Sequence, residues 1–197
     1  SALKLANVGL WSLAADRLKH LKSSGGDWNS NAQTQLDLIA HHAKLTQDQA
    51  RQSFSNVHQQ VLVRLMDGQW QEALKELEKD PLIQADVRES FKTETSRLWK
   101  RLSVAIDDDP NDPILQAWTA MIMLDRDGPA RTKIWLAKQE GSSDRIRALA
   151  ILAPDLLPPK PKVEPKADEK PIAPPDPTAV IPNAKKSPSA IPTSRPY

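Results

Sequence analysis

Apolar residues recur along the first three quarters of the chain at intervals of three and four positions, the spacing that places side chains on one face of a helix. The sequence shows no run of alternating apolar and polar residues, and no turn dipeptide between two apolar runs, so strand and hairpin signals are absent. The pattern therefore predicts an all-α fold over residues 1–153, with about seven or eight helices and no sheet.

Two short helical segments are expected between residues 2 and 22, because the apolar pattern breaks near Gly9. The run Ser23–Gly26 ends the second segment. Asn29 or Ser30 can accept a hydrogen bond from the first turn of the next helix, which we expect to end at about residue 44.

Thr46 is the expected N-cap of a further helix, since Thr46 and Gln49 have the spacing of a capping box. We expect this helix to end at Gly68. Its apolar face has spacings that fit a helix and cannot fit a strand, and it consists of Ala50, Phe54, Val57, Val61, Leu62 and Leu65.

Proline delimits the remaining helices. Asp80-Pro81 ends a short helix that starts at Trp70, and the run Asp108–Pro113 ends the helix that follows. Both ends are expected because proline has no amide hydrogen and disfavours a helical backbone at the residue before it. Further helices are expected at about 84–107, 113–125, 129–139 and 143–152.

A near-repeat with a period of 59 to 60 residues runs through these helices. Its first two copies share a glycine, a tryptophan, an alanine and a leucine at equal spacing: Gly9, Trp11, Ala14 and Leu18, then Gly68, Trp70, Ala73 and Leu77. A weaker third copy starts at Asp127-Gly128, aligned with Asp67-Gly68. Repeats on this scale are typical of stacked helical units, in which each unit buries its apolar face against its neighbours.

These residues resemble the half-motif of tetratricopeptide-repeat (TPR) proteins, which also often ends in a proline such as Pro81. The turn Asp109–Pro113 followed by Trp118 is similar to the family's junction between repeats. The resemblance implies stacked antiparallel helical hairpins, as a TPR-like α-solenoid or an irregular helical array. The chain departs from the family in its longer period, which is about 34 residues in the family, and in Lys133, which stands where the third copy should have alanine.

Charge and composition exclude several classes of function. The net charge is only +2, and basic and acidic side chains are equal in number over residues 1–153, so we expect no nucleic-acid partner. The chain has no cysteine, which removes disulfides, thiolate catalysis and cysteine-type zinc sites.

The sequence offers no constellation for catalysis. Its histidines, which lack the spacing of a zinc-protease motif, are His20, His41, His42 and His58. The run Asp107–Asp109 lacks the glycine and the distal glutamate of a calcium loop, and we interpret it as a solvated turn. No glycine-rich phosphate loop or nucleophile elbow is present. We therefore expect a protein that is not an enzyme and has no catalytic, cofactor or metal site.

The candidate binding residues are one tryptophan and several polar side chains. Five tryptophans lie on apolar helix faces and are expected to pack in the core: Trp11, Trp70, Trp99, Trp118 and Trp135. Trp28 lies outside such a face, either as an exposed anchor for a partner or as a hydrophobic staple onto the next helix. TPR-like proteins bind partners in a groove lined by first helices, where the polar candidates are Gln35, His42, Gln60 and Arg64.

Residues 154–197 differ from the rest of the chain, because they hold most of the 17 prolines together with many lysines. Such a composition predicts a disordered tail with polyproline-II bias. The alternation of proline with lysine and glutamate in this segment is similar in composition to the periplasmic spacers of bacterial envelope proteins. The tail is either a stiff tether or a docking motif, for which Pro158, Pro159 and Pro161 form a P-x-x-P pattern.

The expected function is a non-catalytic protein–protein interaction scaffold or adaptor of TPR-like type, in the cytoplasm or the cell envelope. The alternative is a soluble structural or assembly subunit of a membrane or cell-envelope complex. No run approaches the roughly 20 apolar residues that cross a bilayer, so we expect no direct membrane insertion within this chain. Because the first Gly-x-Trp comes as early as Gly9, we expect the chain to begin inside a repeat, and a membrane anchor upstream would favour the alternative.

Overall fold

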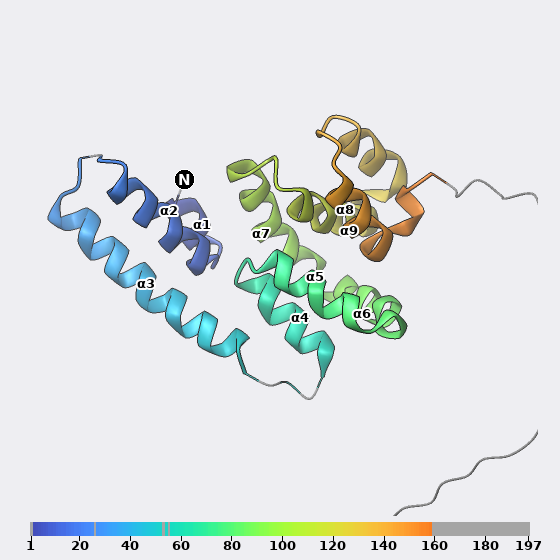
Figure 1. Ribbon diagram of the computed structural model, residues 1–197, viewed down its shortest axis with the longest axis horizontal. Coiled ribbons are helices and arrows are strands. Elements are labelled where there is room, and N and C mark those ends of the chain that lie inside the picture. Colours follow the sequence, from blue (N-terminus) through green and yellow to red (C-terminus); the bar gives the residue numbers. More distant parts are fainter. Residues whose placement is uncertain (1, 26, 53, 55, 159–197) are drawn as a thin grey trace, which may run out of the picture. The chain divides into compact units, whose positions relative to one another are not determined.

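The computed structural model describes residues 2–25, 27–52, 54 and 56–158 (Figure 1). Over these residues the regular secondary structure is helical and contains no strand, which confirms the all-α class. None of the described helices combines the length and apolar character needed to cross a membrane.

The helices follow one another with short connections. The α-helices are α1 (Ala2–Asn7), α2 (Trp11–Ser23), α3 (Ser30–Ala50), α4 (Val57–Met66), α5 (Trp70–Lys79), α6 (Gln84–Phe91), α7 (Thr95–Asp108), α8 (Pro113–Leu136) and α9 (Ser143–Leu152). Short 3-10 helices are η1 (Pro81–Ile83), η2 (Lys92–Glu94) and η3 (Pro154–Leu156).

Side-chain caps fix several helix starts where the sequence predicts them. The Asn29 side chain accepts a hydrogen bond from the amide of Ala32 at 2.9 Å and begins α3. Asp112 accepts hydrogen bonds from the first amides of α8, directly before Pro113. These caps satisfy amide groups that have no partner inside the helix.

The predicted helix boundary at Thr46 is wrong. Helix α3 continues through it to Ala50, and the Thr46 hydroxyl donates to a carboxylate oxygen of Asp67 at 2.6 Å. A long-range hydrogen bond thus occupies the hydroxyl that would have served as a cap. The predicted continuous face from Ala50 to Leu65 is also wrong, because α4 starts only at Val57.

The long helix predicted over residues 84–107 is interrupted. The 3-10 turn η2 separates α6 from α7. The hydroxyl of Thr95 bonds back to the carbonyl of Lys92 at 3.0 Å, and that of Thr93 to the carbonyl of Ser90 at 2.9 Å. Such bonds between side chain and backbone compete with the helical pattern, which explains the break.

The repeat seen in the sequence is also a repeat of backbone structure. Gly9 and Gly68 have φ angles of 84° and 81°, in the left-handed region that favours glycine. The amide of the following residue bonds to the carbonyl five positions before it, Leu10 to Leu5 and Gln69 to Arg64, both at 2.9 Å. This pattern is a Schellman motif, and it joins α1 to α2 in the same way as α4 to α5.

The third copy uses its glycine differently. Gly128 also has a positive φ of 80°, but its ψ is 169°, a combination essentially restricted to glycine. The extended ψ follows from Pro129, which disfavours the helical region at the residue before it. Helix α8 therefore consists of two segments that meet at Gly128, close to the two separate helices expected from the sequence.

Each glycine turn lies after the first helical segment of one of three groups of helices, which we call glycine-turn modules. The first contains α1, α2 and α3, and the second contains α4, α5 and the α6–α7 pair. The third contains the two segments of α8 and then α9. Helix α7 contacts α1 and α4 as well as α8, so it links the modules rather than following them in simple order (Figure 1).

The core runs through all three modules and includes contacts between them. Trp118 on α8 is fully buried, and its indole nitrogen donates to the backbone carbonyl of Trp70 at 3.0 Å. Ala14 and Ala73, the paired small residues of the repeat, are both fully buried. Ile134 on α8 and Ile146 on α9 instead lie at the surface, where they are 61% and 56% exposed.

The chain divides into two parts, Ser1–Pro159 and Lys160–Tyr197. In the first part, helical structure continues past the expected boundary at residue 153, because η3 follows and its Leu156 is buried. The tail that we expected to be disordered was residues 154–197; Pro154–Leu156 form η3 instead, and residues 159–197 lie outside the described residues.

Candidate interaction groove

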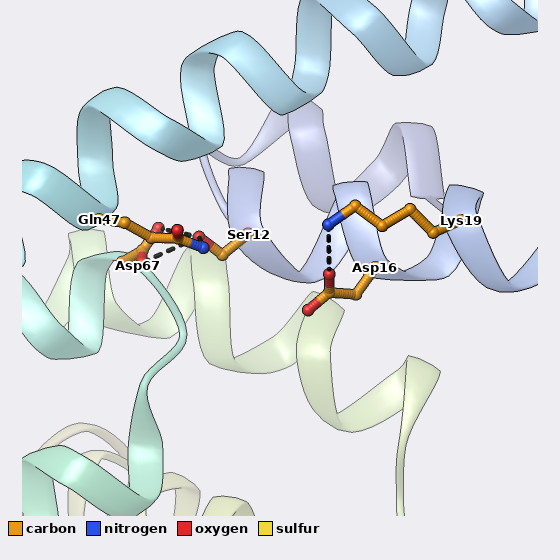
Figure 2. Close-up of polar contacts among 5 residues, drawn as sticks. All are labelled: Ser12, Asp16, Lys19, Gln47 and Asp67. Carbon is orange, nitrogen blue, oxygen red and sulfur yellow. Dashed lines mark hydrogen bonds and ion pairs between the residues drawn. The ribbon is translucent and has the colours of Figure 1, made fainter.

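A buried carboxylate joins three segments of the first part of the chain. Asp67, directly after α4, is 2% exposed and accepts hydrogen bonds from Ser12 on α2 at 2.8 Å and from Thr46 on α3 at 2.6 Å. The side chain of Gln69 donates to its other oxygen at 2.8 Å. Gln47 donates to the Ser12 hydroxyl at 3.0 Å, and Figure 2 shows the side chains of Ser12, Gln47 and Asp67 close together.

The Asp67 carboxylate forms no ion pair with any residue that the structure describes. Neutral donors instead fill its hydrogen-bonding positions, which is what a buried carboxylate requires in the absence of a cation. Asp67 therefore acts as a structural joint that holds α2 and α3 against the turn between α4 and α5. The joint positions the walls of the hollow beside it.

This hollow lies among α2, α3, α4 and α7 and has a volume of about 290 Å³. Its lining combines apolar, polar and basic side chains: Trp11, Thr46, Gln49, Val63, Met66, Asp67, Arg97 and Arg101, with Gly9 between them. A second hollow of about 450 Å³ shares Gly9, Trp11 and Arg101 and adds Lys100 and the end of α1. We call these two hollows, which share three lining residues, the Trp11–Arg101 groove.

Trp11 is held at the groove by an aromatic stack. Its ring lies parallel to that of His42 on α3, with centroids 4.6 Å apart and an interplanar angle of 23°. Trp11 was expected to pack in the core, but its ring is only half-buried and also lines the groove. A rigid, partly exposed tryptophan provides a large apolar contact area at little cost in conformational entropy.

Arg101 lies flat against the first glycine turn. A Cβ atom added at Gly9 would lie 2.9 Å from Nη2 of Arg101, so the guanidinium approaches as closely as only glycine allows. Its Nε atom is buried and has no hydrogen-bond partner. Burial lowers the pKa of Arg101 from its usual value, and the positive charge of Arg97 adds to this effect.

One predicted site residue contacts the lining of the groove. His42 stacks on Trp11 without lining either hollow itself, whereas Gln35 lies exposed on α3 about two turns before it. Gln60 donates to the carbonyl of Ala50 at 2.9 Å and ties α4 to the end of α3. Arg64 pairs with Glu76 on α5 at 3.0 Å.

The other predicted site residues lie elsewhere. Trp28 is half-buried before α3, its indole nitrogen donates to Gln33 at 3.0 Å, and the ammonium of Lys22 lies 5.7 Å from its ring centroid. Pro158 is exposed after η3. Pro159 and Pro161 lie outside the described residues. The predicted residues therefore do not form one site.

Sequence reasoning missed the basic wall of the groove and its joint. Arg97 and Arg101 are four positions apart and share one face of α7, a signal that the sequence contains. Asp67 precedes the repeat glycine, as Asp127 precedes Gly128, and this shared aspartate was a further signal. Neither signal shows that the two sets of residues meet, since the contacts join segments far apart in the chain.

The acidic run that ends α7 is engaged with an arginine. Asp108 pairs with Arg17 on α2 at 2.7 Å, at the mouth of a further hollow of about 300 Å³. Over the described ranges, no group of three or more histidine, aspartate or glutamate side chains is placed to hold a metal ion.

We compared the chain with protein-family models, with characterised proteins and with solved structures, and none of these comparisons gave a match.

Proposed function

We propose that this chain is a non-catalytic scaffold that binds a protein partner through the Trp11–Arg101 groove. The observation that carries the proposal is the groove itself, which is lined by α2, α3, α4, α7 and the end of α1 and presents polar and basic side chains next to apolar ones. Concave sites of this mixed character are where proteins commonly bind ligands. Tryptophan and arginine are also the residues most enriched among the energetic centres of protein interfaces.

The repeat supports the same proposal. Two helix pairs with the same glycine turn, α1–α2 and α4–α5, are consistent with TPR-like hairpins, and we propose that they stack in that manner. Arrays of helical hairpins bind extended segments of their partners along the surface between helices. The groove lies at the first glycine turn, where Gly9 and Trp11 belong to the repeated motif.

Affinity capture of the full chain, followed by mass spectrometry, tests this function. Wild-type chain is compared with Trp11→Ala and with Trp135→Ala, a control that removes another half-buried tryptophan, on α8. We expect wild type and Trp135→Ala to capture the same partner and Trp11→Ala to lose most of it. Circular dichroism of all three proteins checks that the helices are retained.

Two results would contradict the proposal. One is equal capture by Trp11→Ala and wild type, which would place the partner on another surface. The other is a wild-type chain that enriches no protein above the background of an unrelated helical protein.

A further inference from the structure

Arg101 carries a positive charge that the described residues leave uncompensated. It forms no ion pair with any of them, and its only side-chain hydrogen bond to a described residue runs from Nη1 to the carbonyl of Arg97 at 3.4 Å. Its Nε is buried without a partner. A guanidinium that is partly removed from water gains most from a bound carboxylate, which restores the lost hydrogen bonds and neutralises the charge.

The neighbouring charges increase this demand for an anion. Lys100 lines the same groove, is exposed and has no ion pair with the described residues. Arg97 pairs with Glu94 at 2.9 Å, yet the Arg97 side chain remains 64% exposed at the groove. The one acidic residue in the lining is Asp67, and Ser12, Thr46 and Gln69 already occupy its carboxylate.

The apolar part of the lining defines the rest of the ligand. Val63 and Met66 on α4 and the Trp11 ring line the hollow that Arg101 borders. A ligand that fills the groove therefore needs a carboxylate close to an apolar side chain, as a peptide with both kinds of residue provides. A nucleic acid would need an extended basic surface, and basic and acidic side chains balance over the helical part of the chain.

We propose that the Trp11–Arg101 groove recognises an acidic peptide segment of the partner, with a glutamate or aspartate carboxylate bound by Arg101 and Lys100. An adjacent apolar side chain of that segment contacts Val63, Met66 and Trp11. This inference rests on the proposed function and specifies the chemistry of the partner. It also gives Arg101 a role beyond covering the end of α1.

Fluorescence anisotropy with short labelled peptides tests the inference on the full chain. The first probe alternates leucine and glutamate, and matched probes replace every glutamate by glutamine, by lysine or by phosphoserine. Each probe is titrated with wild type, with Arg101→Gln and with Lys138→Gln, which removes an exposed positive charge outside the groove. Melting curves of both variants show whether the fold is retained.

We expect the glutamate probe to bind wild type and Lys138→Gln alike, and to bind Arg101→Gln about tenfold or more weakly, because a charged hydrogen-bonded pair is lost. The affinity of the glutamate probe for wild type should fall as the salt concentration is raised, since salt screens the attraction between exposed charges over a length of about 10 Å at 0.1 M. If Arg101→Gln lowers the melting temperature, Lys100→Gln repeats the comparison at an exposed residue, and it should also weaken binding.

Several results would overturn the inference. These are equal affinity for the glutamate and glutamine probes, a preference for the lysine probe, binding of the phosphoserine probe alone, and no loss in either groove variant. Affinity capture with the same variants distinguishes a failure of the acidic-peptide inference from a failure of the proposed scaffold function. A partner that depends on Trp11 but not on Arg101 or Lys100 would leave the scaffold function standing and reject the acidic ligand.

Discussion

The hydroxyl of Ser12 lies 2.8 Å and 2.9 Å from the two carboxylate oxygens of Asp67, which is 55 residues later in the chain. The two residues belong to consecutive glycine-turn modules, and both are buried. This contact is therefore part of the interface between modules, and it holds one wall of the Trp11–Arg101 groove in place.

Asp67→Asn should destabilise the protein by about 2 kcal/mol, because an amide group would face donors that now bind a carboxylate. Asp16→Asn is the control, since the Asp16 side chain is 70% exposed and, among the described residues, pairs only with Lys19 one turn away, as Figure 2 shows. We expect the control to change stability by less than about 0.5 kcal/mol. Urea denaturation followed by circular dichroism measures both values, and equal effects would mean that Asp67 is no structural joint.

Gly68→Ala should cost more than Gly25→Ala. Both residues have a positive φ, 81° and 76°, so alanine is strained at either site. Only at Gly68 would a Cβ also lie 2.8 Å from the Leu13 side chain, whereas nothing lies within 4 Å of the same atom at Gly25. We expect an additional cost of about 1–3 kcal/mol from overpacking, measured by thermal unfolding. Similar costs at the two sites would show that α2 does not approach the second glycine turn.

Ala73→Trp should cost more than about 2 kcal/mol, because the repeat alanine is fully buried in α5 and has no room for a larger side chain. Ala150→Trp on α9 introduces the same side chain at an exposed helical position and should be close to neutral. Melting curves of the two variants and the parent test the difference. An unchanged melting temperature for Ala73→Trp would count against the packing of the repeat.

Removal of residues 160–197 should leave the helical signal and the melting temperature of the remaining chain nearly unchanged. The composition of this segment provides few apolar residues that could be buried, and its prolines lack amide donors. Circular dichroism of the full and shortened chains makes the comparison. A decrease of several degrees would show that the segment stabilises the helices.

Features that depend on neighbouring residues could be predicted from the sequence. The glycine turns are of this kind, because the turn that ends a helix requires a positive φ, which glycine adopts readily. Gly9 and Gly68 both have this conformation, and the sequence repeat indicates both positions. The cap at Asn29 and the stop before Pro113 are also local. Each depends on the backbone within a few residues of the signal.

Features that depend on tertiary contacts could not be predicted. Thr46 has the spacing of a capping box, yet it lies inside α3, where its hydroxyl donates to Asp67, the residue directly after α4. In the sequence, Arg101 is indistinguishable from other surface charges, and only the fold shows that its side chain lies against Gly9. His42 was predicted as a groove residue, but its stack on Trp11 joins two helices whose crossing the sequence does not define.

Photo-crosslinking from inside the groove tests the central claim most directly. A benzophenone amino acid replaces Gln49, an exposed residue of the groove lining, or Lys138, an exposed residue outside it. After irradiation with the captured partner, we expect a covalent adduct from position 49 and little or none from position 138. An adduct from position 138 alone, while the partner still co-purifies with both proteins, would show that it binds another surface and would contradict the assignment of the groove.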